Sequence, residues 1–206
     1  MKKIFKLLGV LLLLGVAFYV WHVNINYRFE EISKDKVYKS GLIAPDRLES
    51  FLVKNNIKTV IDLLDPGVQD RLNPAKQAEI DAEDKAVAEI NKKNGLAIKH
   101  INIASGQVPN KKTLSKFYEV LDDNASYPVL IHCYHGTGRA AIYSAIYRME
   151  YEGWKNADAR AKTRVIVEAL GYHSSFSDGR SKGDFVMNYK PRTAGENSTL
   201  NQLKEK

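Results

Sequence analysis

Residues 127–139 read Tyr-Pro-Val-Leu-Ile-His-Cys-Tyr-His-Gly-Thr-Gly-Arg, and this stretch decides the fold. A short apolar run, Val129 to His132, follows a proline and predicts a buried strand. Arg139 opens a segment with helical periodicity that reaches Tyr151. The residues between these two elements include two glycines and therefore form a tight turn from strand to helix. Backbone N–H groups in such a turn, together with the helix dipole, converge on one point and predict an anion-binding loop.

Strand and helix patterns alternate on both sides of this stretch. Strands are predicted over 37–39, 57–64, 97–103 and 129–132, and helices over 45–56, 74–93, 111–123, 139–151 and 156–170. The 57–64 segment is rich in β-branched residues and nearly continuous in apolar residues, as in a buried parallel strand. We therefore expect an α/β fold, a single-domain three-layer sandwich whose mostly parallel central sheet is flanked by helices. The 57–64 strand should run parallel to 129–132 and end beside it.

The N-terminal segment does not belong to this domain. Residues 7–23 are an almost unbroken apolar run that follows Lys2, Lys3 and Lys6. The exit of the run is aromatic, whereas a cleaved signal peptide needs small residues there, so we expect an uncleaved membrane anchor. The positive-inside rule then places the rest of the chain outside the cytoplasm, in the periplasm of a bacterium. A cleaved signal peptide, which would release the protein to the periplasm, and a buried core helix are the alternatives.

The expected organisation has four parts. Residues 1–24 form the signal anchor or signal peptide, 25–35 a polar linker, 36–192 the α/β domain, and 193–206 a polar tail. The basic side chains near the C-terminus could attract anions, but we expect them in a solvated tail; they are Arg180, Lys182, Lys190 and Arg192.

Charge and cysteine content exclude several classes of protein. One cysteine in 206 residues excludes an intramolecular disulfide framework and a zinc site made of thiolates alone. The net charge is +7, and it falls to +4 for residues 24–206 because three lysines precede the apolar run. This charge is small and dispersed, so we expect no nucleic-acid partner. It suits small anionic ligands or a solvated surface.

Cys133 and Arg139 have the residue types and the spacing needed for phosphoryl chemistry. Cys133 begins the loop, where backbone amides and the arginine would stabilise its thiolate and make it a nucleophile. Arg139 follows six residues later, and its planar guanidinium can bind two oxygens of a phosphoryl group, which a lysine cannot do. Gly136 and Gly138 permit the tight turn. A buried, inert cysteine would explain none of these neighbours.

These residues resemble the H-C-x5-R signature of the cysteine-dependent protein tyrosine phosphatase superfamily, and in particular its bacterial dual-specificity-like phosphatases. His132, Cys133 and Arg139 match the signature one for one. Further similarities lie in Tyr-Lys-Ser-Gly at 38–41, in 57–63 and in 127–133, so that the resemblance covers about 36–170. It implies a hydrolase that acts on phosphotyrosine-like phosphate monoesters through a phosphocysteine intermediate and needs neither a metal nor another cofactor. A phosphorylated protein or a small phosphate ester is the expected partner.

The resemblance also assigns roles within the loop. Cys133 is the nucleophile, and phosphate is bound by the loop and the arginine, that is by Tyr134, His135, Gly136, Thr137, Gly138 and Arg139. His132 is expected to support the loop through hydrogen bonds. His135 either faces the substrate or is an exposed loop residue. A zinc site of His132, Cys133 and His135 is not expected, because neighbouring residues of a strand point to opposite faces.

Two departures from the family pattern concern proton transfer and the leaving thiolate. The family supplies its general acid as an Asp in the loop after the third strand, but 104–109 contain no carboxylate. Asp65 and Asp70 follow the neighbouring strand and are the candidate general acids, or else solvated turn residues. Ala140 stands where the family commonly has Ser or Thr, whose hydroxyl stabilises the cysteine thiolate. We therefore expect slow hydrolysis of the phosphocysteine, with Thr137 as a partial substitute.

Two other functions use the same residues. A phosphate-binding pseudophosphatase would keep the anion-binding loop and turn over weakly. A sulfurtransferase of the rhodanese type would use the same lone cysteine, although the sequence before the loop matches phosphatases better.

Overall fold

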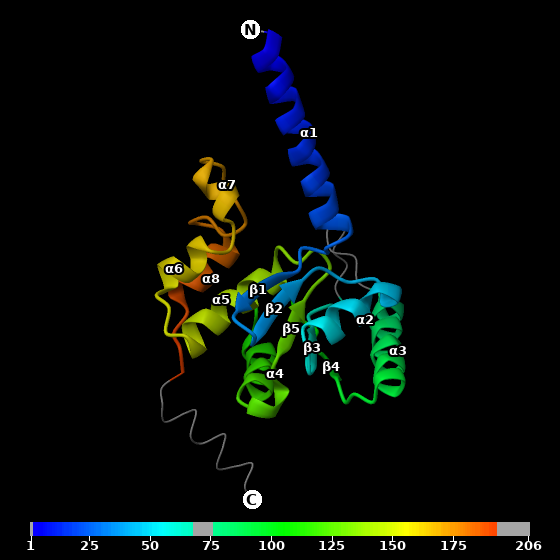
Figure 1. Ribbon diagram of the computed structural model, residues 1–206. Coiled ribbons are helices and arrows are strands. Elements are labelled where there is room, and N and C mark those ends of the chain that lie inside the picture. The colour runs from blue at the N-terminus through cyan, green and yellow to red at the C-terminus, as the bar shows by residue number, and fades with distance from the viewer. Residues whose placement is uncertain (1, 68–75, 193–206) are drawn as a thin grey trace, which may run out of the picture.

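The computed structural model describes residues 2–67 and 76–192. A five-stranded sheet forms its centre (Figure 1). The strands are β1 (Glu30–Ser33), β2 (Val37–Ser40), β3 (Thr59–Asp62), β4 (Lys99–Asn102) and β5 (Val129–His132), in the order β1-β2-β5-β3-β4. Pairing is parallel between β2 and β5, between β5 and β3, and between β3 and β4. It is antiparallel between β1 and β2. The predicted parallel pairing of 57–64 with 129–132 is confirmed, because β3 lies beside β5.

The strand register aligns the C-terminal ends of β2, β5 and β3. Ser40 of β2 and Asp62 of β3 both pair with His132, the last residue of β5. Alternate residues of a strand point to opposite faces, so Asp62 and His132 lie on the same face as Val60 and Leu130. Cys133 follows His132 and belongs to the hydrophobic cluster of the opposite face.

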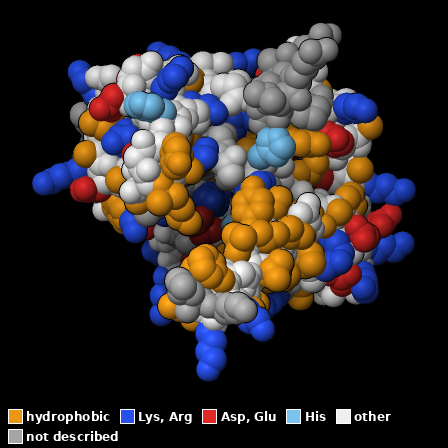
Figure 2. Space-filling model, turned by 90° about the horizontal axis from the view of Figure 1, so that it is seen from above, with side chains coloured by type: hydrophobic (Ala, Val, Ile, Leu, Met, Phe, Trp, Pro, Cys, Tyr) orange, Lys and Arg blue, Asp and Glu red, His pale blue; other side chains and the backbone are white. Residues whose placement is uncertain are grey.

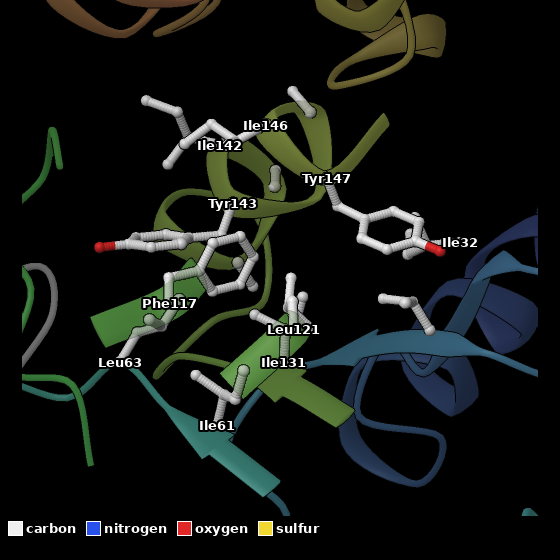
Figure 3. Close-up of a cluster of buried hydrophobic side chains, with 14 of the residues drawn as sticks. Ile32, Ile61, Leu63, Phe117, Leu121, Ile131, Ile142, Tyr143, Ile146 and Tyr147 are labelled. Atoms are coloured by element: carbon white, nitrogen blue, oxygen red, sulfur yellow. The ribbon is translucent and has the colours of Figure 1, made fainter. Parts of the chain in front are cut away.

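Helices cover both faces, which confirms the three-layer architecture. α2 (Pro45–Lys54) and α3 (Gln77–Asn94) cover one face, where Leu48, Leu52 and Val87 pack against Val60 and Leu130. α4 (Lys111–Leu121) and α5 (Arg139–Tyr151) cover the other face, and a short 3-10 turn, η1 (Asn124–Ser126), leads into β5. Phe117 of α4 meets Tyr143 of α5 edge-on at 4.8 Å above Ile131 (Figure 3).

The tyrosines spaced four residues apart on α5 pack rather than bind. Tyr143 is fully buried, Tyr147 is almost so, and Tyr147 stacks on Tyr151 with 5.4 Å between the ring centroids. Nearly every side chain of α5 is buried, so the helix that follows the anion-binding loop is fixed in the core. A fixed helix gives the loop a rigid support.

Residues 25–35 are not a polar linker throughout, which corrects that expectation. β1 pairs with β2 at the edge of the sheet and exposes Glu30 and Glu31, so the polar sequence reflects an edge strand. Tyr27 packs edge-on against Phe51 of α2, and Phe29 stacks on Tyr38 of β2. The segment that leads from the apolar helix is therefore part of the domain.

The region after α5 also differs from the prediction. The helix expected over 156–170 is divided into α6 (Asn156–Ala161) and α7 (Val165–Ala169). At the break the Thr163 hydroxyl donates to the carbonyl of Arg160, a local bond that competes with the helix. A further helix, α8 (Ser181–Asn188), lies in the expected solvated tail and packs against α6.

Lys182 is buried and Arg192 is half-buried, whereas Arg180 and Lys190 are exposed as expected. Arg192 donates to Glu150 at 2.6 Å and to Asp122 at 2.8 Å, and it lies 3.9 Å above the ring of Tyr118. Lys182 is 9% exposed. Ion pairs with two carboxylates thus fix the end of the domain, and the assumption of a uniformly solvated tail is corrected. The polar tail expected over 193–206 lies outside the described residues.

α1 (Lys2–Asn24) extends away from the domain (Figure 1). Its mean hydropathy reaches 2.2 and its apolar side chains are exposed, so it is long and apolar enough to cross a membrane; signal sequences share these properties. Seen from the side of α1, hydrophobic side chains gather in the middle of the molecule and Lys and Arg side chains surround them (Figure 2). This face also contains the end of α1 that joins the domain.

Candidate active site

The loop from β5 to α5 has the predicted limits, and the thiol lies at its base. Cys133 is fully buried. Its Sγ accepts the backbone N–H of Gly136 at 3.3 Å and that of Ala140 at 3.5 Å. Two backbone donors, one within the loop and one in the first turn of α5, therefore meet at the sulfur and stabilise negative charge there.

Gly136 of the loop is required by a close contact with the end of β2. Gly136 has φ +72°, and a Cβ there would lie 2.5 Å from the amide nitrogen of Gly41. The N–H of Leu42 donates to the carbonyl of Tyr134 at 3.1 Å. The Tyr-Lys-Ser-Gly segment at 38–41 therefore supports the anion-binding loop from behind, and a side chain at Gly136 would push the two segments apart.

Arg139 begins α5 and is only 4% exposed. One nitrogen of its guanidinium is hydrogen-bonded to the protein, and the other two are not bonded to any described residue. Its Nη1 donates to the carbonyl of Leu63 at 2.7 Å and to that of Ser105 at 3.3 Å. Its Nε and Nη2 are buried and donate to no described residue. Because one edge of the guanidinium is anchored, the other presents two parallel N–H groups, the geometry that binds two oxygens of a phosphoryl group.

The 104–109 loop, where the family has its general acid and this chain has no carboxylate, helps to hold Arg139. Ser105 is buried, its carbonyl accepts from Arg139, and its Oγ accepts the hydroxyl of Tyr143 at 3.0 Å. Gln107 lies near the anion-binding loop, with its Oε1 3.7 Å from where a Cβ of Gly138 would be. This loop brings an amide to the site rather than a carboxylate.

Lys182 is a site residue that the sequence analysis placed in solvent. Its Nζ lies 2.9 Å from where a Cβ of Gly138 would be, and 5.9 Å from the ring centre of Phe176. The ammonium group of α8 therefore stands beside the anion-binding loop and adds positive charge to it. The apolar residues Phe185 and Val186 on the same helix are the signal that could have indicated burial there.

The segment after α1 also reaches the loop. Arg28 donates from Nη1 to the carbonyl of His135 at 3.0 Å, and the N–H of Gly41 donates to the carbonyl of Tyr27 at 2.7 Å. The side chain of His135 is exposed and meets the ring of Tyr134 edge-on at 4.8 Å. A residue only four positions beyond α1 is thus in direct contact with the site.

Of the two candidate general acids, the structure describes only Asp65. Asp65 follows β3 and is half-buried, and its Oδ1 accepts the N–H of Gly67 at 3.0 Å. Asp70 lies outside the described residues. The carboxylate that β3 itself contributes, Asp62, is fully buried on the far face of the sheet from Cys133, so it is no candidate.

His132 faces a buried ionic cluster rather than the loop. Its Nε2 lies 2.9 Å from Oε2 of Glu83 and 3.7 Å from Oδ1 of Asp62, and neither ring nitrogen forms a hydrogen bond with a described residue. The hydrogen bonds by which His132 was expected to orient the loop are therefore replaced by these ionic contacts. The same Glu83 oxygen lies 3.3 Å from Nε2 of His100.

The cluster is strongly ionic. Burial disfavours the charged form of His132, but the charges of Glu83 and Asp62 outweigh it and raise the pKa of His132 to about 9. Burial likewise opposes ionisation of Glu83, but the charge of His132 and the contact with His100 lower the pKa of Glu83 to about 2. Sequence reasoning missed Glu83 and His100, because no local pattern connects α3 and β4 with β5.

This architecture defines a class of protein. An α/β domain in which one loop holds a buried thiol, converging backbone amides and an anchored arginine is a cysteine-dependent phosphatase of the protein tyrosine phosphatase type. A family model described as "DSP-PTPase phosphatase fused to NAD+ Kinase" matches residues 24–175, and the chain belongs to this family. No curated protein matches the sequence significantly.

Solved structures share the fold at low identity. The core catalytic domain of the PP-IP phosphatase SIW14 from S. cerevisiae, in complex with citrate, is 16% identical over 84% of this chain and 92% of its own, with a TM-score of 0.57. TpbA of P. aeruginosa is 17% identical over 89% of this chain and 94% of its own, with a TM-score of 0.55. A cysteine-to-serine variant of TpbA, solved in complex with pTyr, is 17% identical over 79% and 88% of the two chains, with a TM-score of 0.50.

Proposed function

We propose that this phosphatase hydrolyses phosphotyrosine-like phosphate monoesters, with Cys133 as the nucleophile and Arg139 as the phosphate clamp. The observation that carries the proposal is the arginine, whose Nη1 is anchored while Nε and Nη2 donate to no described residue. The sulfur in the same loop accepts two backbone N–H groups. A dianionic phosphoryl group would satisfy the two N–H groups of the arginine and place its phosphorus above the sulfur.

The reaction follows in two steps. In the first, the Cys133 thiolate attacks phosphorus, an S–P bond forms, and the P–O bond to the leaving group breaks. Arg139 and the loop amides bind the equatorial oxygens throughout. In the second, water attacks phosphorus, the S–P bond breaks, and inorganic phosphate and the thiolate are released. The N–H groups of Gly136 and Ala140 stabilise the departing sulfur.

Proton donation to the leaving group is the weak part of this site. Asp65 is the carboxylate we assign to it, because it follows β3 at the same edge of the sheet and is partly open to solvent. Asp65→Asn keeps the acceptor for the N–H of Gly67 and removes the acid. Hydrolysis of an alkyl phosphate should then fall more than that of p-nitrophenyl phosphate, whose leaving group needs little protonation. An equal loss on both substrates would remove Asp65 from this role.

The weak acid favours substrates with good leaving groups, namely aryl phosphates or phosphoanhydrides. The structure of TpbA with pTyr supports an aryl phosphate, and SIW14 is described as a PP-IP phosphatase. We favour phosphotyrosine in a protein. Lys182 and Arg28 at the rim of the loop would attract the phosphate dianion.

The proposal is tested with Cys133→Ser. We expect hydrolysis of p-nitrophenyl phosphate to fall by about 10⁴-fold or more, because a serine hydroxyl in this loop is not ionised. Binding of tungstate should persist, because the amides and Arg139 remain. Activity near that of the wild type would overturn the assignment. A wild-type chain that binds tungstate without any turnover would instead indicate the pseudophosphatase, and thiosulfate-to-cyanide sulfur transfer would indicate the rhodanese type.

We further propose that α1 anchors the enzyme and that the catalytic domain lies outside the cytoplasm. The apolar side chains of α1 are exposed, and Lys2, Lys3 and Lys6 at its N-terminal end precede its apolar run. Because Arg28 contacts the loop four residues after α1, the site would lie close to the membrane surface. An alkaline phosphatase fusion after residue 206 should be active, and the full chain should sediment with membranes. Release of a soluble chain beginning near residue 22 would indicate cleavage, and an inactive fusion would overturn the orientation.

A further inference from the structure

A second chemical site lies on the opposite face of the sheet from the anion-binding loop. Four side chains meet there from four different elements: Asp62 of β3, Glu83 of α3, His100 of β4 and His132 of β5. One ligand atom of each lies within 4.8 Å of one such atom of every other. All four side chains are at most 4% exposed. Catalysis as proposed uses none of these groups directly.

The distances within this cluster bracket those between the ligands of one metal ion. Oε2 of Glu83 is 2.9 Å from Nε2 of His132 and 3.3 Å from Nε2 of His100. The oxygens of Asp62 are 3.7 Å and 4.0 Å from the same two nitrogens. In a tetrahedral zinc site with bonds of about 2.0–2.1 Å, neighbouring ligand atoms are separated by about 3.3–3.4 Å. The four separations are distributed around that value.

His132 supplies independent support for a ligand. Its side chain is 1% exposed, and its Nε2 is aimed into the cluster yet hydrogen-bonds to no described residue, even with Glu83 Oε2 at 2.9 Å. The carboxylate oxygen therefore lies close to the nitrogen but away from the N–H direction. A ring nitrogen and an oxygen that are close without a hydrogen bond are arranged as two ligands of a common ion would be.

The surroundings orient the four groups as metal ligands are commonly oriented. His100 places Nδ1 3.3 Å from Oδ1 of Asp84, the carboxylate–histidine contact that fixes the ring and directs the other nitrogen to a metal. Asp62 accepts the N–H of Leu64 at 2.7 Å and the amide of Asn102 at 2.9 Å. Both carboxylate oxygens of Asp62 are thus held in place from outside the cluster.

We propose that Asp62, Glu83, His100 and His132 bind one Zn²⁺ ion in a closed, structural site behind the anion-binding loop. Two imidazole nitrogens and two carboxylate oxygens suit zinc better than magnesium or calcium, which prefer oxygen alone. Two neutral imidazoles and two carboxylates carry two negative charges, which a divalent ion balances inside the protein. Four protein ligands leave no coordination position for substrate.

Such an ion would join the ends of β3 and β5 to β4 and α3, behind the loop. Asp62 and His132 are paired in the sheet, and His132 precedes Cys133. His132, Cys133 and His135, which the sequence did not favour as a zinc site, do not meet around one point, because Cys133 lies on the opposite face of the sheet from His132. The structure gathers a different set around His132, drawn from residues far apart in the chain.

Metal analysis of the full chain tests the proposal without any measurement of activity. The chain is purified in detergent with no metal-affinity step, and zinc is measured by inductively coupled plasma mass spectrometry. We expect about one zinc ion per chain. Dipicolinate should remove it and lower the unfolding temperature, Zn²⁺ should restore that temperature, and Co²⁺ should give the visible absorption of a four-coordinate nitrogen and oxygen site. A chain without zinc whose unfolding temperature does not respond to Zn²⁺ or Co²⁺ would overturn the proposal.

Variants distinguish this site from other zinc-binding groups. His100→Gln and Glu83→Gln should each weaken zinc binding by at least about 10-fold, whereas the exposed His173→Gln should bind as the wild type does. Cys133→Ser should also keep its zinc, and loss of the ion in that variant would show that the thiol binds it, contradicting the proposal. Full zinc content in His100→Gln would contradict it too. If the cluster variants do not fold, the cobalt spectrum of the wild type still decides, because sulfur ligation adds a charge-transfer band that nitrogen and oxygen ligands do not give.

Discussion

His132 and Cys133 are neighbours in the chain, but they belong to two regions with opposite properties. Cys133 faces a loop that presents donors outward, since Arg139 keeps Nε and Nη2 without a partner among the described residues. His132 faces a closed cluster in which Glu83 and Asp62 surround it. The end of β5 therefore supplies the thiol of Cys133 on one face of the sheet and the buried, ion-paired imidazole of His132 on the other. Changes in the first region should affect catalysis, and changes in the second should affect stability.

Glu83→Gln should give the largest effect, and the effect should be on stability. It removes the carboxylate that two buried histidines share, so the free energy of unfolding should fall by about 3–5 kcal/mol. The matched control is Glu89→Gln on the same helix, whose side chain is 71% exposed and whose replacement should cost at most about 0.5 kcal/mol. Urea unfolding measures both, and equal stability of the two variants would remove the distinction between the regions.

Arg139→Lys should give the opposite pattern. A lysine cannot donate to Leu63 and at the same time offer two parallel N–H groups, so kcat/KM should fall by roughly 10²–10³-fold. The fold should persist, because α5 is held by many buried side chains. The variant is checked with p-nitrophenyl phosphate and by circular dichroism. An unchanged kcat/KM would show that the arginine is structural.

Ala140→Ser should accelerate the second chemical step. Ala140 contributes only its backbone N–H to the sulfur, at 3.5 Å, and serine would add a hydroxyl at that position. The steady-state rate should rise, with a gain limited to about 1.5–3 kcal/mol for a hydrogen bond to a charged group. The pre-steady-state burst should shrink at the same time. A slower variant with an undiminished burst would show that breakdown of the intermediate does not depend on this position.

Lys182→Met should give the smallest effect, on substrate binding. Removing a positive charge beside Gly138 should raise KM roughly 10-fold and change kcat little. Lys190→Met is the control, because Lys190 is exposed on the segment after α8. Steady-state kinetics at low ionic strength measure both variants. The same KM in the two variants would remove Lys182 from the site.

The catalytic region was accessible to sequence reasoning and the ionic cluster was not. Cys133, the glycines and Arg139 lie within one short stretch of sequence, and the limits of β5 and α5 agree with the prediction residue by residue. Glu83 and His100 lie on elements whose patterns show only an amphipathic helix and a short strand, and their meeting with His132 depends on strand order. Lys182 was misplaced because a short helix after several loops has no strong periodic signal.

Trapping the phosphocysteine shows whether Cys133 carries the phosphoryl group between the two steps. Rapid quench of the wild type with p-nitrophenyl phosphate should show a burst that approaches one equivalent of nitrophenol per site. Mass spectrometry of the acid-quenched protein should find the phosphate on the peptide that contains Cys133, because S–P bonds survive acid. Neither the burst nor the phosphopeptide should appear with Cys133→Ser. Turnover of the wild type without a burst and with no phosphate on Cys133 would show that Cys133 is not the nucleophile.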